Sequence, residues 1–377
     1  MIKLKSSVIV ATVILLACSC EYSAENRAGI SKEAFGKTMD GKQISLWTLK
    51  NKNGMEMSVT NLGGKVVTLY VPDKDGNMVD VVTGFKSIDK YIESNELYFG
   101  AAIGRVGNRI ARSEFTIDGQ VYKVVANNGP NHLHGGERGL HAVVWDAKQT
   151  AKNKLELTYL SKDMEEGYPG NMEIKMTYEL TDDNAFAIEY YATTDKKTLC
   201  NLTHHSYFNL SGEGSSSILD HELYINANGF TITDGDLIPT GTIAQVDGTP
   251  LDFRTPKTIG ENIHDDFQPL RDGFGYDHNF VIAKKESGVE LIAAASSPKT
   301  GIKMEVYSDQ PGVQLYSGNF MDGREIGKSD KPYKYRSAFC LETQKFPDAP
   351  HHPTFPSIEL KPGDTYRHTC IYKFSVK

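Results

Sequence analysis

The sequence predicts an all-β protein, a large antiparallel β-sandwich, and three observations support this fold class. Apolar and polar residues alternate at many points along the chain, which is typical of half-buried strands. The 377 residues include 19 tyrosines and 34 glycines, which suit strands and the turns that join them. No stretch keeps a capped helical period over three turns, so any helices are expected to be short.

Two hairpins are the clearest of the expected elements. Residues 115–122 alternate on either side of Asp118-Gly119, a dipeptide that favours a tight turn. Residues 172–180 alternate strictly between apolar and polar side chains, and residues 186–190 repeat the pattern after Asp182-Asp183-Asn184. We therefore expect these two runs to form a second hairpin.

The rest of the chain suggests one domain. Every second residue is apolar at 302–306 and again at 370–374, so both are expected to be strands. The best helical segment is short, at Ser87–Glu93. No linker, internal repeat or low-complexity segment separates two cores, so residues 31–377 are expected to fold as a single unit.

Composition argues against several functions. Hydrophobic residues make up 39% of the chain and the formal net charge is −7, so a core is feasible but a broad basic surface for nucleic acid is not. The five cysteines lack CxxC spacing, so no disulfide framework or zinc signature is expected. Nucleotide-binding and nucleophile-elbow motifs are missing from the sequence, and no cofactor is expected.

The first residues have the layout of a secretory signal. Two lysines precede an uncharged run, Val8 to Ala17, that is too short to span a bilayer. Cys18 follows, as in a bacterial lipoprotein signal, in which this cysteine receives the lipid. We therefore expect a signal peptide at 1–17, lipidation of Cys18 and a polar tether at 18–30. The expected location is the bacterial cell envelope, facing the periplasm, with membrane contact only through the lipid; simple cleavage is the alternative.

Six segments concentrate histidine, asparagine, acidic residues and glycine in strand-like surroundings. Each segment alone is weak evidence of function, because a histidine beside glycine is more often a turn residue than a catalyst. The paired histidines could ligate a metal, but no nearby carboxylate has ligand spacing, so none is expected. In chain order the segments are FGAAIGRVGNRI (99–110), NHLHGG (131–136), NLTHHSYFNL (201–210), YDHNF (276–280), PGVQLYSGNF (311–320) and CLETQKFPDAP (340–350).

Taken together and in this order, the six segments closely resemble those of the aldose 1-epimerase (galactose mutarotase) family. The resemblance implies a β-sandwich of the galactose mutarotase type with an open sugar-binding cleft. It also implies an enzyme that interconverts the α and β anomers of free aldoses such as D-glucose and D-galactose. At the matching positions, the expected cleft residues are Asn108, Arg109, His134, His205, Asp277, Gln314 and Glu342.

Anomer exchange needs a base at the C1 hydroxyl and an acid at the ring oxygen, and ring closure exchanges their roles. The resemblance implies that Glu342 is the base and His205 the acid. His134 and Arg109 would then stabilise charge around C1 and the ring oxygen. Asp277 would accept hydrogen bonds from sugar hydroxyls, and Asn108 and Gln314 would have supporting roles.

Two positions depart from the family pattern. His204 stands where many relatives have asparagine, and Gly107 stands where many have alanine. Both lie beside matched residues, so they bear on fine specificity more than on activity.

Three other functions remain open from the sequence. A glycoside hydrolase would use Asp277 and Glu342 as its two carboxylates, although the histidine-rich segments fit it poorly. A non-catalytic sugar-binding lipoprotein would need no acid–base pair, and a sugar-phosphate enzyme would need a cluster of arginine and lysine. The preferred aldose, the oligomeric state (monomer or dimer) and the membrane leaflet are not decided by the sequence.

Overall fold

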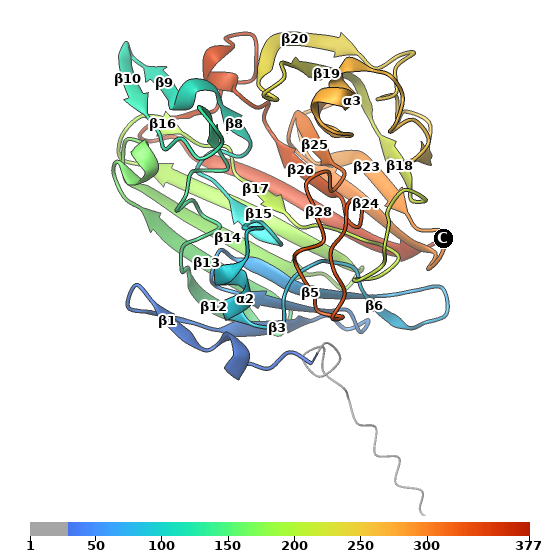
Figure 1. Ribbon diagram of the computed structural model, residues 1–377. Coiled ribbons are helices and arrows are strands. Elements are labelled where there is room, and N and C mark those ends of the chain that lie inside the picture. The colour runs from blue at the N-terminus through green and yellow to red at the C-terminus, as the bar shows by residue number, and fades with distance from the viewer. Residues whose placement is uncertain (1–28) are drawn as a thin grey trace, which may run out of the picture.

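The computed structural model describes residues 29–377, and β-sheets dominate them (Figure 1). Among these residues the three largest sheets have nine, five and four strands. Neighbouring strands within every sheet pair antiparallel. The expected all-β, antiparallel architecture is therefore confirmed. The expected signal peptide and Cys18 lie outside the described residues.

The nine-stranded sheet crosses the whole molecule. Its spatial order differs from the chain order, because the carboxyl-terminal strand β28 lies in its middle, between β15 and β24. In spatial order the strands are β12 (Asp146–Ala151), β13 (Lys154–Ser161), β14 (Met172–Leu180), β15 (Ala185–Thr194), β28 (Tyr366–Val376), β24 (Ile302–Ser308), β23 (Glu290–Ser296), β18 (Glu222–Ile225) and β21 (Lys257–Thr258).

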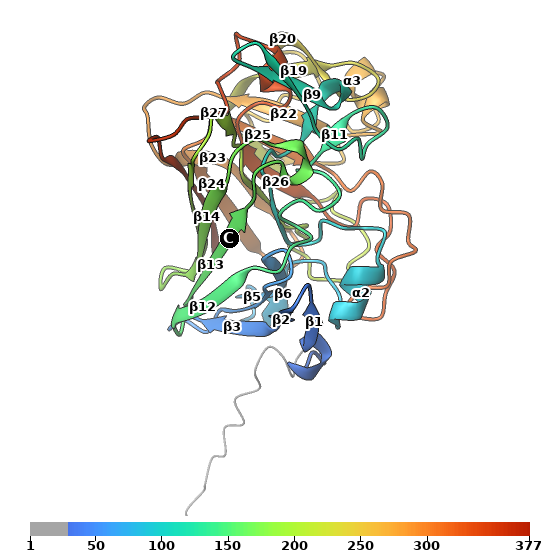
Figure 2. The same cartoon turned by 90° about the vertical axis from the view of Figure 1, so that its left-hand side faces the viewer.

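The five- and four-stranded sheets lie against this large sheet. The five-stranded sheet contains, in spatial order, β20 (Pro239–Gln245), β19 (Ala227–Thr233), β22 (Asp277–Ile282), β25 (Gly312–Tyr316) and β26 (Cys340–Gln344). The four-stranded sheet contains β3 (Leu46–Lys50), β4 (Glu56–Thr60), β5 (Lys65–Pro72) and β6 (Met78–Asp80). Figure 2 shows β13, β14, β23 and β24 along one side, with β25 and β26 beside them and β3, β5 and β6 below.

Five two-stranded pairs complete the sheet structure of the described residues. They are β1 (Lys37–Met39) with β2 (Lys42–Ile44), β7 (Ala101–Ile103) with β17 (Thr203–His205), β8 (Arg109–Ile110) with β11 (His132–Leu133), β9 (Glu114–Ile117) with β10 (Gln120–Lys123), and β16 (Thr198–Leu199) with β27 (Glu359–Leu360). Two of these pairs, β7 with β17 and β8 with β11, include residues of the expected cleft.

Helices are short, as expected. Ser87 precedes α2 (Ile88–Glu93), and its hydroxyl accepts a hydrogen bond from the backbone N–H of Lys90, which caps the helix. The other helices are α3 (Gln268–Asp272) and the 3₁₀ turns η1 (Glu33–Phe35), η2 (Ala111–Ser113), η3 (Glu165–Gly167) and η4 (Ala349–His351). Within residues 29–377 no helix is long and apolar enough to cross a membrane.

Both predicted hairpins are present. Strand β14 covers the alternating run 172–180 and pairs with β15 from Leu180 opposite Phe186 to Met172 opposite Thr194. In the second hairpin, Asp118 and Gly119 have φ values of 50° and 80°, and this left-handed backbone is what a tight turn between twisted strands requires. In β14 every apolar residue of the alternating run is buried, so there the alternation predicted the buried side of the strand.

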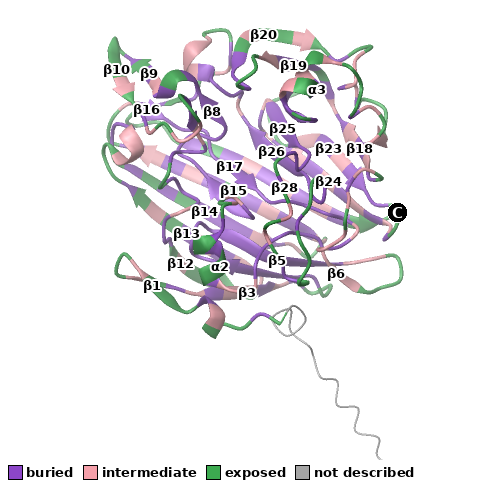
Figure 3. Ribbon diagram, in the orientation of Figure 1, coloured by how far each residue is buried: buried purple, intermediate pink, exposed green. Residues whose placement is uncertain are grey.

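The main core lies between the sheets. Met176 and Ile188 of the large sheet, Leu69 of β5 and Leu315 of β25 belong to one continuous buried cluster. The hydroxyl of Tyr372 in β28 donates to the backbone carbonyl of Leu341 in β26 at 2.9 Å, which joins two sheets directly. Figure 3 shows buried residues along the middle of the large sheet. This layered core gives the cleft strands a rigid support.

Candidate active site

The strand that carries His205 lies beside the strand that carries Glu342. Phe208, just after β17, forms an antiparallel bridge with Phe339, just before β26, with hydrogen bonds of 2.7 and 2.9 Å between their backbones. Continuing this antiparallel register back along β17 and forward along β26 places His205 opposite Glu342. Residues more than a hundred positions apart thus meet because of strand pairing.

His205 and Glu342 form the centre of the site. The Nε2 atom of His205 lies 3.5 Å from Oε1 of Glu342, and both side chains are buried. The other carboxylate oxygen, Oε2, has no hydrogen-bond partner in the described protein. A buried carboxylate oxygen without a partner is costly, so a ligand hydroxyl at this position would satisfy it.

Strand alternation separates His205 from its neighbour His204. Successive side chains on a strand point to opposite faces, and His204 points into the core, where its ring nitrogens lie 2.7 Å from the Ser206 hydroxyl and 3.4 Å from the Tyr178 hydroxyl. His132 is likewise used structurally, because it bonds the Val125 carbonyl and the Tyr168 hydroxyl. Neither His204 nor His132 lines the cleft.

A tight local structure presents Asn108 and His134. Both have left-handed backbone, with φ of 61° and 52°, a conformation that asparagine and histidine tolerate better than most residues. Their backbones are joined by a hydrogen bond from His134 N to Asn108 O at 3.0 Å. The N–H of Asn108 donates to Nδ1 of His134 at 3.2 Å. Since Nδ1 accepts, the neutral His134 ring must carry its proton on Nε2.

The binding side of the site contains Asp277, Gln314 and Arg109. Gln314 lies opposite Glu342 in the pairing of β25 with β26, and its amide Nε2 donates to Oδ1 of Asp277 at 2.7 Å. The guanidinium of Arg109 lies 3.9 Å from Asp277 and is buried. Arg109 is therefore not an ordinary surface charge, since it is only 8% exposed.

One cavity joins these side chains. Six of the seven expected residues line it, namely Asn108, Arg109, His134, His205, Asp277 and Glu342. The seventh, Gln314, is held against Asp277. Sequence reasoning missed further residues of the same cavity: Glu96, Tyr98, Leu133, Tyr207, Tyr316 and Phe320. Three of these aromatic residues stood inside the recognised segments, so their position was a usable signal, whereas Glu96 gave none.

Aromatic rings enclose the histidines. The Tyr98 ring centroid lies 4.7 Å from that of His134 and 5.7 Å from that of His205. The Tyr207 ring centroid lies 4.9 Å from that of His205. These rings exclude water from the pair and offer apolar surface of the kind that packs on a pyranose.

Burial changes the proton affinities of the central pair. It raises the pKa of Glu342 well above its ordinary value, with a further increase from the Asp277 charge and an opposing effect from Arg109. Burial also lowers the pKa of His205 to about 3 and that of His134 well below its usual range. Both shifts have the same cause, because a low-dielectric site disfavours a charge of either sign.

The fold also brings together three side chains that could bind a metal ion, which composition could not reveal. Ligand-competent atoms of His134, His205 and Glu342 lie within 4.8 Å of one another, so a carboxylate does stand near the histidines. However, with its proton on Nε2, His134 has no free lone pair to offer. These three residues therefore offer a metal cation fewer ligand atoms than their number suggests.

A buried carboxylate–imidazole pair beside hydroxyl-binding groups and aromatic rings defines an enzyme that moves protons on a sugar. Comparison with known proteins narrows this class. The family model for aldose 1-epimerase matches residues 45–373. The chain is 41% identical to galactose mutarotase of Sus scrofa, over 92% of this chain and 99% of that protein. It is 35% identical to aldose 1-epimerase of Escherichia coli K12, over 89% and 96% of the two chains.

Solved structures agree with the sequence relatives. A GalM/aldose epimerase homologue from C. elegans superimposes with a TM-score of 0.81 at 32% identity, covering 88% of this chain and 99% of that one. Galactose 1-epimerase from Lactobacillus acidophilus gives a TM-score of 0.78 at 26% identity, over 90% and 97%. This chain belongs to the aldose 1-epimerase family. It is an isomerase with mutarotase activity, as its sequence segments implied.

The expected location in a bacterial cell envelope, facing the periplasm, is wrong. The relatives that contradict it are galactose mutarotases of Sus scrofa, Bos taurus and Homo sapiens, at 40–44% identity. That expectation came only from the two lysines, the apolar run and Cys18 among the first residues, whereas the family match begins at residue 45. A short apolar run is thus too general a pattern to assign a compartment.

Proposed function

We propose that the cleft binds a free aldose such as D-galactose or D-glucose, with its C1 hydroxyl beside Glu342 and its ring oxygen beside His205. The observation that carries this proposal is the buried contact of 3.5 Å between His205 Nε2 and Glu342 Oε1, next to an unpaired Glu342 Oε2. A base and an acid this close can reach two oxygens attached to the same carbon.

Ring opening then follows with balanced protons. The Glu342 carboxylate takes the proton of the C1 hydroxyl, and the C1–O1 bond gains double-bond character. The bond from C1 to the ring oxygen breaks, and its electron pair goes to that oxygen, which takes a proton from His205 Nε2. The aldehyde rotates about the C1–C2 bond, and the reverse transfers close the ring on the other face.

The number of protons held by Glu342 and His205 explains how a buried site can catalyse this reaction. A charged pair (carboxylate and imidazolium) and an uncharged pair (carboxylic acid and neutral imidazole) hold the same number of protons. The uncharged pair is the state that ring opening produces. Because burial raises the pKa of Glu342 and lowers that of His205, the free site also favours the uncharged pair. The reaction therefore begins when the shared proton passes from Glu342 to His205 Nε2 beside the bound sugar, and ring opening returns the pair to its favoured uncharged state.

Cys340 selects which nitrogen of His205 exchanges its proton. The Sγ atom lies 3.4 Å from Nδ1, and the His205 backbone carbonyl also attracts the proton of this ring. With the Nδ1 hydrogen directed toward this sulfur, Nε2 is the exchangeable site, and it faces Glu342. A thiol is a weak acceptor compared with a carboxylate, so it leaves His205 a strong acid.

The remaining residues bind and polarise the sugar. His134 donates from Nε2, and with Arg109 it stabilises the negative charge that develops near C1 and the ring oxygen. Asp277 accepts hydrogen bonds from hydroxyls of the sugar. Asn108 fixes His134 through its backbone N–H, and Gln314 holds the Asp277 carboxylate.

We assign this activity to a single domain of residues 31–377, which is supported by the family match over 45–373 and by the continuous core. Cleavage ahead of Cys18 and lipidation of that residue stay predictions from the sequence. Mass spectrometry of the mature amino terminus tests both, because an unmodified Met1 would contradict them.

Polarimetry tests the proposed substrates. Freshly dissolved α-D-galactose and α-D-glucose are followed with and without the purified protein. The protein is expected to speed the approach to the same final rotation for both sugars. An unchanged rate with either sugar removes it from the substrates, and an unchanged rate with both contradicts the proposal.

A further inference from the structure

The cleft arginine, Arg109, is held at one nitrogen by a residue outside the sugar cavity. Its Nε donates a hydrogen bond to the side-chain oxygen Oδ1 of Asn128 at 3.2 Å. Within residues 29–377 no other side chain is hydrogen-bonded to this guanidinium, and the Asp277 carboxylate comes only to 3.9 Å from its Nη2. Asn128 does not line the cleft, and the proposed mechanism gives it no part.

Asn128 belongs to a turn that is fixed at both ends. Its backbone N–H donates to the carbonyl of Asn131, and its carbonyl accepts from the N–H of Asn131, both at 3.0 Å. Gly129, at the tip, has a left-handed φ of 59°, which glycine adopts without strain. The Asn131 side chain accepts from the backbone N–H of Arg112 at 2.9 Å. The turn is therefore tied to the chain segment that follows Arg109 itself.

The same turn also holds the strand that precedes His134. The Asn127 side chain accepts a hydrogen bond from the backbone N–H of Leu133 at 2.8 Å and donates one to the Leu133 carbonyl at 2.9 Å. One short turn thus contacts both strands of the pair β8 and β11. The two residues proposed to stabilise charge near C1, Arg109 and His134, are therefore held relative to each other.

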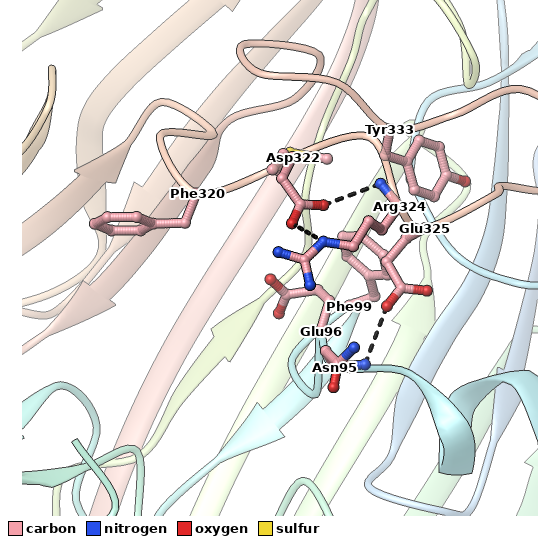
Figure 4. Close-up of a pocket in the computed structure, with 9 residues that line it drawn as sticks. Asn95, Glu96, Phe99, Phe320, Asp322, Arg324, Glu325 and Tyr333 are labelled. Atoms are coloured by element: carbon pink, nitrogen blue, oxygen red, sulfur yellow. Dashed lines mark hydrogen bonds and ion pairs between the residues drawn. The ribbon is translucent and has the colours of Figure 1, made fainter. Parts of the chain in front are cut away.

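The charge of the acceptor matters for Arg109. Arg324 shows the contrasting arrangement, because its Nε pairs with the carboxylate of Asp322 (Figure 4). A carboxylate on Arg109 Nε would form a charge-assisted bond and cancel much of the field of this guanidinium in the cleft. The amide of Asn128 carries no net charge, so it fixes the direction of the guanidinium and leaves the positive charge to act on the sugar.

We propose that Asn128 is a positioning residue, whose neutral amide holds Arg109 Nε so that the outer nitrogens and the charge of the guanidinium serve the sugar. This inference rests on the proposed function, in which Arg109 stabilises the negative charge that develops near C1. It makes the contribution of Asn128 depend on an Nε–H group at position 109. Lysine keeps the positive charge but has no such group, so the contribution should disappear in an Arg109→Lys background.

Four substitutions separate these effects. Asn128→Ala removes the acceptor, whereas Asn128→Asp keeps its shape and adds a negative charge. Arg109→Lys serves as the second background for Asn128→Ala. Asn228→Asp is the matched control for charge, because Asn228 is exposed in β19. Mutarotation of freshly dissolved α-D-galactose is measured by polarimetry for the parent and each variant, and thermal unfolding confirms that each is folded.

The expected changes in kcat/KM differ between the variants. Asn128→Ala should lower it by about fivefold in the parent, but by less than about twofold in the Arg109→Lys background. Asn128→Asp should lower it by about tenfold or more, mainly through kcat, because the charge on the sugar develops in the transition state. Asn228→Asp should stay at the parent value.

Two results would overturn the positioning role. One is an equal effect of Asn128→Ala in both backgrounds, or none in either, because a purely structural residue does not depend on the Nε–H of Arg109. The other is an Asn128→Asp variant that is no slower than Asn128→Ala. A parent that does not turn over galactose would instead count against the proposed function.

Discussion

The two cleft histidines have similar surroundings but opposite proton positions. In His134 the N–H of Asn108 occupies Nδ1, so Nε2 carries hydrogen and can only donate. In His205 the neighbour of Nδ1 is Cys340 Sγ, and in the proposed mechanism Nε2, which faces Glu342, loses and regains a proton. The neighbour of Nδ1 thus gives two chemically identical residues two different roles.

The pH dependence of activity tests whether Glu342 and His205 share one proton in the active enzyme. The active pair holds one proton, and a second is added only as pH falls toward the lowered pKa of His205, about 3. We therefore expect kcat/KM to stay level as pH falls through about 6.5, the ordinary histidine value. Initial rates in polarimetry across the acidic range check this, with circular dichroism to confirm folding. An acid limb centred between about 6 and 7 would contradict it.

Two of the cleft residues that sequence reasoning missed, Glu96 and Tyr98, lie outside the recognised segments. The resemblance identified titratable and amide residues that were already grouped in compact segments. Glu96 and Tyr98 both precede β7, in a loop without periodicity that lies against the cleft. A wall built from loops depends on contacts between distant segments, which a single sequence does not display.

At the scale of elements, strand register creates the site. His205 and Glu342 belong to different sheets and meet through one bridge between Phe208 and Phe339. The same register puts Gln314 beside Glu342. Because side chains alternate along a strand, a shift of one residue in β17 would replace His205 with His204 in the cleft. The register at the Phe208–Phe339 bridge therefore depends on how firmly the neighbouring segments of both strands are held in place.

Arg336 fixes the loop between β25 and β26. Its guanidinium donates to the Ser317 hydroxyl at 2.7 Å, to the Phe274 carbonyl at 2.6 Å and to the Asn319 side chain. The loop carries Phe320, and the cluster is buried. A lysine at this position would keep the charge but lose the forked geometry that reaches several acceptors.

Arg336→Lys is therefore expected to lower the free energy of unfolding by about 2–4 kcal/mol and to raise KM, because Phe320 loses its support. Urea denaturation and mutarotation kinetics measure the two effects. Arg324→Lys, on an exposed arginine of the same loop, is the matched control for stability and should change it by less than about 0.5 kcal/mol. Equal losses in both variants would show that the buried network has no special role.

Local elements were predictable because their causes are local. Alternation specified β14 and β15, the Asp118-Gly119 turn specified another hairpin, and Ser87 specified the start of α2. The order of the nine-stranded sheet was not predictable, since β28 joins β15 to β24 across large distances in the chain. Such pairings are decided by how apolar faces pack together.

At the scale of the whole molecule, several histidines are buried as neutral groups. Burial lowers the pKa of His132 and His278 to about 4 and that of His141 and His204 to about 3. In the unfolded chain each would titrate near its ordinary value of about 6.5. Below that pH the unfolded state binds more protons, so stability is lost as pH falls from there toward the folded pKa.

We therefore expect acid sensitivity that single substitutions can reduce. Each such histidine costs at most about 1.4 kcal/mol per pH unit below about 6.5. His204→Asn removes one of these groups, so its stability should fall less steeply with acid than that of the parent. Urea denaturation at a series of pH values gives the slopes, and His264→Gln, which lies on the exposed surface, is the control. A parent whose stability is constant from about pH 6.5 to 4.5 would contradict the explanation.

An isosteric variant of Glu342 shows whether this residue is the base of the mutarotase. Glu342→Gln keeps the shape of the side chain and its neighbours but cannot take the proton of the C1 hydroxyl. Polarimetry of freshly dissolved α-D-galactose is compared for parent and variant at equal concentration. We expect a loss of kcat by about 10²–10⁴, with the same final rotation and with sugar binding retained. A folded variant that turns over galactose at the parent rate would contradict it.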